Sequence, residues 1–217
     1  MTPSQVTSRA PADHAADDTI LPFEVAALDL RGRLVRLGPS LDHILSRHDY
    51  PAAISKLLGE AIVLTVLLGS SLKFDGRFIL QTKSDGPVRM IVVDYRSPGK
   101  VRACAQFDSS ALDGAQAISP AALTGHLLGR GHLAMTIDQG VDMNRYQGLV
   151  ALTGGSLEEA AHEYFLRSEQ IPTKVRLAVA EELSAGADGP HHRWRAGGML
   201  LQFLPKKAER MLSLIHI

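Results

Sequence analysis

The sequence predicts an α+β fold, in which a mainly antiparallel sheet packs on helices that include one long buried helix over residues 51–72. Two observations lead to this prediction. Helical and strand patterns come in blocks, which favours antiparallel pairing over the strict alternation of a parallel doubly wound fold. The segment from Pro51 to Leu72 repeats apolar residues at three- and four-residue steps, and beyond Val63 its opposite face is apolar as well. A helix that is apolar all round is buried.

A membrane span is the alternative interpretation of this long segment. Its charge-free part runs only from Ala61 to Leu72, whereas a span needs about 20 apolar residues. Gly69, Ser70 and Ser71 dilute it further. At about 1.5 Å per residue the helix would be about 33 Å long, the width of a small domain. We therefore predict a central core helix and no membrane partner.

Composition narrows the class of protein. A chain of 217 residues fits one large domain, or one domain with an appendage. Its 23 basic residues balance its 23 acidic ones, which gives no electrostatic case for nucleic acid or an anionic membrane. Cys104 is the only cysteine, which suits a reducing cytoplasm. Residues 1–20 lack the apolar core of a secretory signal, and we expect a disordered leader there.

The first half of the chain is predicted to contain two helices and five strands. Residues 23–30 and 34–37 form paired strands, with 31–33 as their turn. A short helix opens at Pro39 and ends before Pro51, because the residue preceding a proline disfavours helix. After the long helix, turn residues at 84–87 and 97–99 separate three apolar segments, and we predict a three-stranded meander over 78–83, 88–95 and 101–107.

The second half continues in the same mixed pattern. We expect a loop over 109–116, a short helix over 120–127 and a strand pair over 133–138 and 146–152. Ser156 with Glu159 three residues later is a capping box that begins a helix, and Pro172 ends it. A strand over 173–180, a Gly-rich loop over 184–192 and a last apolar segment over 194–204 follow.

The candidate chemical motifs are weak. The helix start at Gly154-Gly155-Ser156 could hold a phosphate, but the chain has no GxGxxG and no P-loop lysine, and the capping box already explains the serine. No G-x-S-x-G or H-E-x-x-H occurs, and His191-His192 falls in a loop expected to be solvated. Cys104 shares a strand face with Arg102 and Gln106, and we predict a small buried side chain there. We expect no catalytic, cofactor-binding or metal residue.

One polar cluster supports an alternative function. Arg167, Ser168, Glu169 and Gln170 stand together at a helix C-terminus, directly before Ile171-Pro172. Helix-dipole and capping interactions account for these residue types. The alternative is a small-molecule enzyme that uses this cluster near the helix start at residues 154–156.

Longer motifs recur in a recognisable order. Segments 48–51, 72–76, 85–87, 145–148, 164–173 and 196–205 together resemble signatures of the heat shock protein 33 family of redox-regulated holdase chaperones, over about residues 21–205. The residues that carry the two longest motifs are Tyr164, Phe165, Arg167, Ser168, Glu169, Gln170, Pro172, Gly197, Gly198 and Met199.

The resemblance implies an ATP-independent, non-enzymatic stress-response chaperone of the cytoplasm that binds unfolded proteins and forms a homodimer. In the full-length family a C-terminal domain holds zinc with four cysteines, as C-x-C and C-x-x-C, and oxidation forms disulfides, expels the zinc and unfolds a linker. This sequence has neither motif, and Cys104 matches none of the four cysteines. No zinc ligand is therefore assigned here, and the residues that contact client proteins are unknown.

The resemblance also divides the chain. Residues 21–205 correspond to the chaperone core, and 206–217 to the start of a truncated linker. Residues 212–217 resemble the translation of a common sequencing adaptor, and we expect that they are not native. If the linker normally covers apolar core surface, the chain should expose a patch, and should suppress client aggregation without an oxidant or self-associate.

Overall fold

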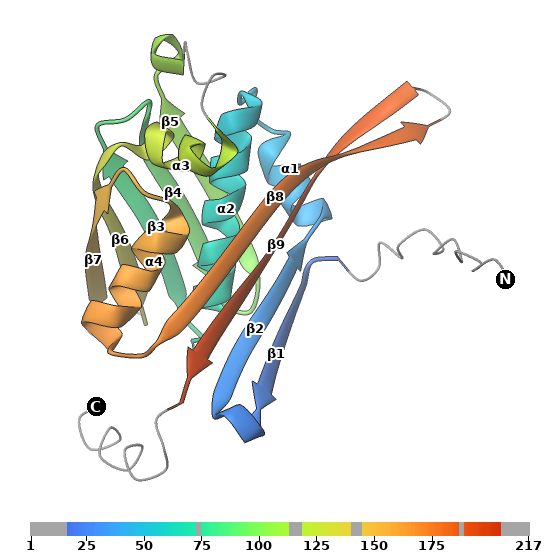
Figure 1. The fold of residues 1–217 in the computed structure, drawn as a ribbon. Coiled ribbons are helices and arrows are strands. Elements are labelled where there is room, and N and C mark those ends of the chain that lie inside the picture. Colours follow the sequence, from blue (N-terminus) through green and yellow to red (C-terminus); the bar gives the residue numbers. More distant parts are fainter. Residues whose placement is uncertain (1–16, 73–74, 113–118, 140–144, 187–188, 205–217) are drawn as a thin grey trace, which may run out of the picture.

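The protein is described by a computed structural model over residues 17–72, 75–112, 119–139, 145–186 and 189–204 (Figure 1). The predicted linker at 206–217 and most of the predicted leader at 1–20 lie outside these residues. The first strand, β1, begins at Thr19, within the last two residues of that leader.

Two antiparallel sheets form the body of the fold. The four-stranded sheet has the order β1-β2-β9-β8 and the five-stranded sheet the order β5-β4-β3-β6-β7, and every pairing between neighbouring strands is antiparallel. The prediction of an α+β fold with mainly antiparallel sheet is confirmed. The strands are β1 (Thr19–Val25), β2 (Leu30–Leu37), β3 (Arg77–Ser84), β4 (Val88–Arg96), β5 (Lys100–Phe107), β6 (Arg130–Asp138), β7 (Tyr146–Thr153), β8 (Thr173–Gly186) and β9 (Gly189–Phe203).

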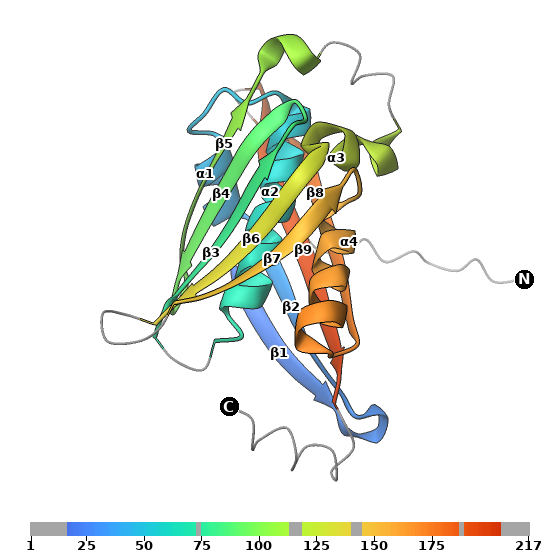
Figure 2. The same cartoon turned by 90° about the vertical axis from the view of Figure 1, so that its left-hand side faces the viewer.

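The long helix α2 (Ala52–Gly69) fills the space between the sheets. Figure 2 looks onto the five-stranded sheet, with α2 behind it and the four-stranded sheet beyond the helix. Among the described residues α2 is the one helix long and apolar enough to cross a membrane by length and composition, but 78% of it is buried inside the protein. The predicted core helix is confirmed, although it ends at Gly69 rather than Leu72.

Shorter helices close the ends and edges of this sandwich. α1 packs on β9 and α2, α3 lies over α2 and β4, and α4 bridges the edge strands β7 and β8. Leu41 and Leu45 of α1 and Leu127 and Leu128 of α3 are fully buried, so both helices seal the core. The helices are α1 (Pro39–Leu45), α3 (Pro120–Leu128) and α4 (Leu157–Tyr164), with 3-10 turns η2 (Ala26–Leu28) and η3 (Ser109–Leu112) and a π-helical turn η5 (Phe165–Glu169).

The predicted turn at residues 31–33 is wrong. These residues lie inside β2, which pairs with β1 on one side and β9 on the other. The chain reverses earlier, through η2, and Asp29 takes a left-handed conformation with φ of 47° to close the turn. A short polar side chain is tolerated in that conformation, which is why Asp29 can replace the expected glycine.

The predicted loop at 184–192 is also wrong in large part. β8 runs to Gly186 and β9 starts at Gly189, so the two strands extend as a long hairpin that projects beyond the sheet (Figure 1). Side-chain contacts link the two strands of this hairpin: His192 Nδ1 lies 2.7 Å from a Glu181 oxygen, and Arg195 Nε lies 3.1 Å from Glu182. Cross-strand pairs of opposite charge stabilise a ladder that apolar periodicity does not reveal.

Candidate functional site

The outward side of the four-stranded sheet carries a continuous group of apolar residues. Val35, Ala196 and Leu200 point inward and are buried, so the alternate positions of β2 and β9 point away from α2. The strand register then places eight side chains on one outer surface, which we call the outer apolar face: Leu21, Phe23 and Val25 of β1, Leu30 and Leu34 of β2, and Met199, Leu201 and Phe203 of β9.

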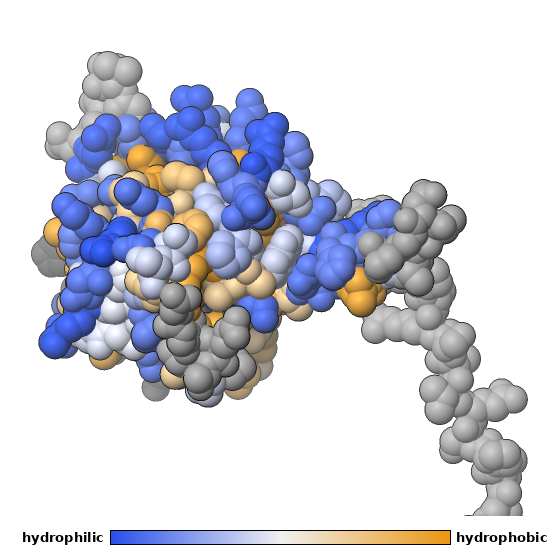
Figure 3. All heavy atoms as spheres, turned by 90° about the horizontal axis from the view of Figure 1, so that it is seen from above, coloured by the Kyte–Doolittle hydropathy of each residue, from blue (hydrophilic) through white to orange (hydrophobic). Residues whose placement is uncertain are grey.

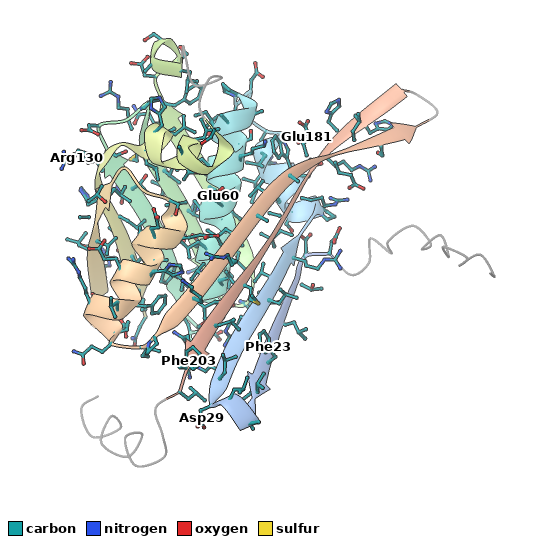
Figure 4. The ribbon with its side chains drawn as sticks, viewed as in Figure 1. Phe23, Asp29, Glu60, Arg130, Glu181 and Phe203 are labelled. Carbon is teal, nitrogen blue, oxygen red and sulfur yellow. The ribbon has the colours of Figure 1, made fainter. Side chains whose placement is uncertain are left out.

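Several members of the outer apolar face are open to solvent. Leu21 is 59% exposed, Phe203 52%, and Val25 and Leu34 38% each. Phe23 and Phe203 lie toward the same end of the sheet (Figure 4). Leucines, methionine and phenylalanine occupy paired positions on neighbouring strands, so the exposed side chains form one group rather than being scattered. Contiguous apolar surface of this kind is typical of a site that binds a partner.

Positive side chains border the outer apolar face on its β8 side. Lys174 pairs with Leu201, and Arg176 pairs with Met199, so both stand on the same outer surface. Arg176 donates a hydrogen bond of 2.8 Å to Glu158 of α4, which draws that guanidinium toward the edge of the sheet. An apolar centre with a polar rim is the usual organisation of a protein interaction surface.

The face of the molecule seen in Figure 3 is more hydrophilic than the outer apolar face. Hydrophilic side chains surround it, with hydrophobic ones only in patches between them. The outer surface of the five-stranded sheet is likewise mainly polar, since Arg77, Lys83, Arg102 and Gln106 occupy its outward positions.

The helix that carries the first signature motif is a structural element. Ser156 Oγ accepts from Glu159 N and Glu159 accepts from Ser156 N, so the predicted capping box is confirmed. The helix widens into η5, and Gln170 ends it in a left-handed conformation with φ of 53°. Ile171 N donates to Phe165 O at 3.2 Å, and the chain turns into β8.

Tyr164 joins this helix to the five-stranded sheet. Its hydroxyl donates to Glu169 Oε1 at 2.7 Å and lies 3.4 Å from the hydroxyl of Tyr146 on β7. Burial, followed by these hydrogen bonds, raises the pKa of Tyr164 well above its usual value. The ring lies against Gly148, where a Cβ would collide with it. The motif therefore fixes α4 and η5 on β7.

The same helix covers the edge of β8. Glu158 accepts from Leu177 N at 2.6 Å, and His162 Nε2 accepts from Val175 N at 2.8 Å. Burial, with help from nearby Lys174, lowers the pKa of His162, which keeps the ring neutral and able to accept. Unpaired edge N–H groups invite pairing with other chains, and here two side chains satisfy them.

The second signature motif brings the long helix close to the sheet. Gly198 of β9 lies against Val63 of α2, and a Cβ at Gly198 would collide with that valine. Gly197 and Met199 alternate to the outer surface, where Met199 belongs to the outer apolar face. The motif thus sets the helix-to-sheet distance and contributes to the exposed surface.

The structure separates the two parts of the proposed enzyme site. Arg167, Ser168, Glu169 and Gln170 are exposed at the C-terminal end of the helix, and the start at residues 154–156 lies at its other end, about 20 Å away by helix rise. Arg167 forms an ion pair with Glu163 at 3.0 Å. At the helix start the carboxylate of Glu159 already occupies Ser156 N. Pro172 follows η5, and Thr173 begins β8.

Cys104 is exposed, so its predicted burial is wrong. It shares the outward face of β5 with Arg102 and Gln106, as predicted, but that face is covered by no other element among the described residues. Among all the residues that the structure describes, no group of three or more His, Cys, Asp or Glu side chains is placed to hold a metal ion. The C-x-C and C-x-x-C cysteines that hold zinc in the full-length family have no counterpart in this sequence, so no described residue is assigned to zinc.

Sequence reasoning missed the outer apolar face. Alternating apolar residues at 21, 23 and 25 and at 199, 201 and 203 were a signal for it. The strand over 19–25 was placed too late in the chain, and the partners of β9 were unknown, so the three strands could not be assembled into one surface.

Comparisons with known proteins agree with the family resemblance of the sequence motifs. The family model described as Hsp33 protein matches residues 18–216. The chain is 46% identical over 202 residues to a 33 kDa chaperonin of Caulobacter vibrioides, covering 92% of this chain and 65% of that protein. It is 36% identical over 190 residues to the 33 kDa chaperonin of Edwardsiella ictaluri, covering 88% of this chain and 59% of that protein.

A solved structure supports the fold. The crystal structure of the 33 kDa chaperonin (heat shock protein 33 homolog) of Thermotoga maritima superposes with a TM-score of 0.64 at 22% identity, over 88% of this chain and 63% of that one. The chain thus spans just under two thirds of the length of the relatives that it matches.

Proposed function

The chain belongs to the Hsp33 family, and on that premise we propose that it is a holdase chaperone core that binds unfolded polypeptides without ATP. The outer apolar face is the observation that carries the proposal. An unfolded client exposes apolar side chains that a folded protein buries, and burying them on this surface removes both from water. The proposal involves no covalent step and assigns no catalytic residue.

The layout of the surface suits polypeptides of varied sequence. Its leucine, methionine and phenylalanine side chains provide apolar contact without requiring one hydrogen-bonding partner, and methionine adapts to irregular shapes. Lys174 and Arg176 at the border favour segments that carry acidic residues beside their apolar ones. The cytoplasmic location and the homodimer implied by the resemblance belong to this proposal, as does regulation by oxidation in the full-length family.

The test uses suppression of light scattering from a heat-denatured client. In a double variant, Leu21→Glu with Leu34→Glu, two charges stand on paired positions of the outer apolar face. We expect the wild-type chain to suppress the scattering under reducing conditions. Its single cysteine cannot form an internal disulfide, so its activity cannot depend on one. The double variant should lose most of it, because each carboxylate must lose hydration when a client binds.

Leu149→Glu is the matched control. Leu149 is 61% exposed on β7, which belongs to the other, five-stranded sheet, and its variant should retain wild-type suppression. Circular dichroism and thermal unfolding verify that all variants are folded. Equal suppression by the double variant and the wild type would refute the assignment of the surface, and failure of the wild type to suppress aggregation would refute the holdase proposal itself.

A further inference from the structure

A cluster of positive side chains lies on the other sheet, on its outer surface. Strand register places Arg77 of β3 opposite Arg96 of β4, and Arg96 opposite Lys100 of β5. Arg102 stands one row further along β5, opposite Asp94. Because Phe78 and Tyr95 point inward and are buried, the intervening positions point outward. We call Arg77, Arg96, Lys100 and Arg102 the basic cluster. The three strands run side by side in Figure 2.

Asp94 orders half of the basic cluster. Arg77 donates to its two carboxylate oxygens at 2.6 and 2.7 Å, and Arg102 donates from Nε at 2.6 Å. The hydrogen bonds from Arg77 contribute most to lowering the pKa of Asp94, so the carboxylate stays charged. Arg102 uses only Nε in this contact, which leaves its two terminal nitrogens facing solvent, and its side chain is 78% exposed.

Arg96 and Lys100 form the other half of the basic cluster. Within the part of the chain that the structure describes, neither Arg96 nor Lys100 forms an ion pair or a side-chain hydrogen bond. Asp138, opposite Arg77 on β6, is paired with Arg145 at 3.0 Å. Like charges directly opposite one another destabilise a sheet, and here two such pairs adjoin. Four cations around one carboxylate leave an excess of positive charge.

The basic cluster lines a hollow. A cavity of about 290 Å³ is bounded by its four side chains together with Asp94 and Val101. This volume is at the lower end of the range for small-molecule sites, so it fits a small ligand rather than a folded partner. Guanidinium groups bind phosphate oxygens through paired N–H donors, and an ammonium adds a compact charge. We propose that the basic cluster is a binding site for a small di- or triphosphate anion.

The spacing of the basic cluster explains the preference for more than one phosphate. Opposite side chains on neighbouring strands lie about 5 Å apart, and successive outward rows along a strand about 7 Å apart. The long side chains of both rows can converge on one small anion, as Arg77 and Arg102 do on Asp94, but a linear di- or triphosphate carries enough charge along its length to contact Arg96, Lys100 and Arg102 together. Its bound charge also relieves the repulsion between Arg77 and Arg96 and between Arg96 and Lys100. This site is separate from the outer apolar face and does not depend on the holdase proposal.

The experiment measures binding of inorganic tripolyphosphate to the full chain by titration calorimetry, with ATP as a second arm. The test variant is Arg96→Ala with Lys100→Ala, two exposed residues without ion pairs among the described ones. We expect saturable binding to the wild type and at least about tenfold weaker binding to the variant, because two charge-assisted contacts are lost. Lys83→Ala, which removes a cation from the same outer surface two rows or more away, should bind as the wild type does.

Thermal unfolding provides a second measurement. Without ligand the double variant should be at least as stable as the wild type, since its like-charge pairs are gone, and tripolyphosphate should raise the melting temperature of the wild type and not that of the variant. The proposal is overturned if tripolyphosphate shows no saturable binding, if Lys83→Ala weakens binding as much as the double variant does, or if ATP binds while tripolyphosphate does not. The last result would mean that the nucleoside is recognised instead.

Discussion

Glu60 is the one carboxylate on the buried helix α2, and it should make stability depend on pH. Its Oε2 accepts from Thr124 Oγ1 of α3 at 3.3 Å (Figure 4 labels Glu60). Burial, opposed by the Thr124 hydrogen bond and assisted by the negative charge of Glu158, raises the pKa of Glu60 from 4.5 to about 7. The charged form is therefore disfavoured in the folded state.

The sign and size follow from linkage. A raised carboxyl pKa means that the folded state binds more protons between about pH 4.5 and 7, so folding stability falls as pH rises through that window. The full shift is worth about 3 kcal/mol. Between about pH 5 and 8 the wild type should lose about 2.5 kcal/mol that Glu60→Gln does not lose, because a glutamine keeps the acceptor for Thr124 without a titratable charge.

The assay is urea unfolding of both proteins at about pH 5 and 8. Histidines titrate in the same range, but they are common to the two chains and cancel in the difference. Thr124→Val should steepen the loss, because it removes the hydrogen bond that favours the charged form of Glu60. If the stability difference between the wild type and Glu60→Gln is the same at both pH values, the reasoning about burial is refuted.

Two further predictions concern packing and acid stability. Gly198→Val should destabilise the fold by about 1–3 kcal/mol, since the new side chain would overlap Val63. Thermal unfolding measures the effect, with Gly99→Val as the control because a side chain at Gly99 would meet no other atom. Equal destabilisation by the two substitutions would contradict the close approach of Gly198 to Val63. Asp94→Asn should lose less folding stability at low pH than the wild type does. The pKa of Asp94 is depressed in the folded state, so the stabilisation by its carboxylate is present above the unfolded pKa and is lost as pH falls through the folded pKa. Unfolding curves between about pH 6 and 2 that remain parallel for both chains would exclude this role.

Local patterns predicted most secondary structure because each depends on near neighbours. The capping box of Ser156 and Glu159 and the apolar periodicity of α2 both appear as expected. The errors arose where long-range pairing decided the outcome. Residues 31–33 contain a glycine between arginines, which indicates a turn, yet pairing on both sides draws them into β2. Residues 184–192 are rich in turn formers, yet the pairing of β8 with β9 continues to Gly186 and Gly189 and keeps most of them in strands.

The signature motifs illustrate the same limit at the candidate site. Sequence resemblance singled out Gly198 and Tyr164, but it could not say that one seats α2 against β9 and the other fastens α4 to β7. The residue pattern, independently of the resemblance, favoured burial for Cys104, because a lone cysteine is usually a small core residue. Its exposure depends on the absence of any described element over that face of β5.

By itself the sequence determined the fold class, the identity of the core helix and the family, since a run of apolar residues with a helical period and motifs in a fixed order are properties of the chain alone. Tertiary structure decided where function can lie. The outer apolar face exists because β9, which begins more than 150 residues after the end of β2, pairs with it, so that β1, β2 and β9 align their outward positions in one sheet. Exposure is a property of that assembly, because an alternating strand has two faces and only packing shows which of them remains in contact with water.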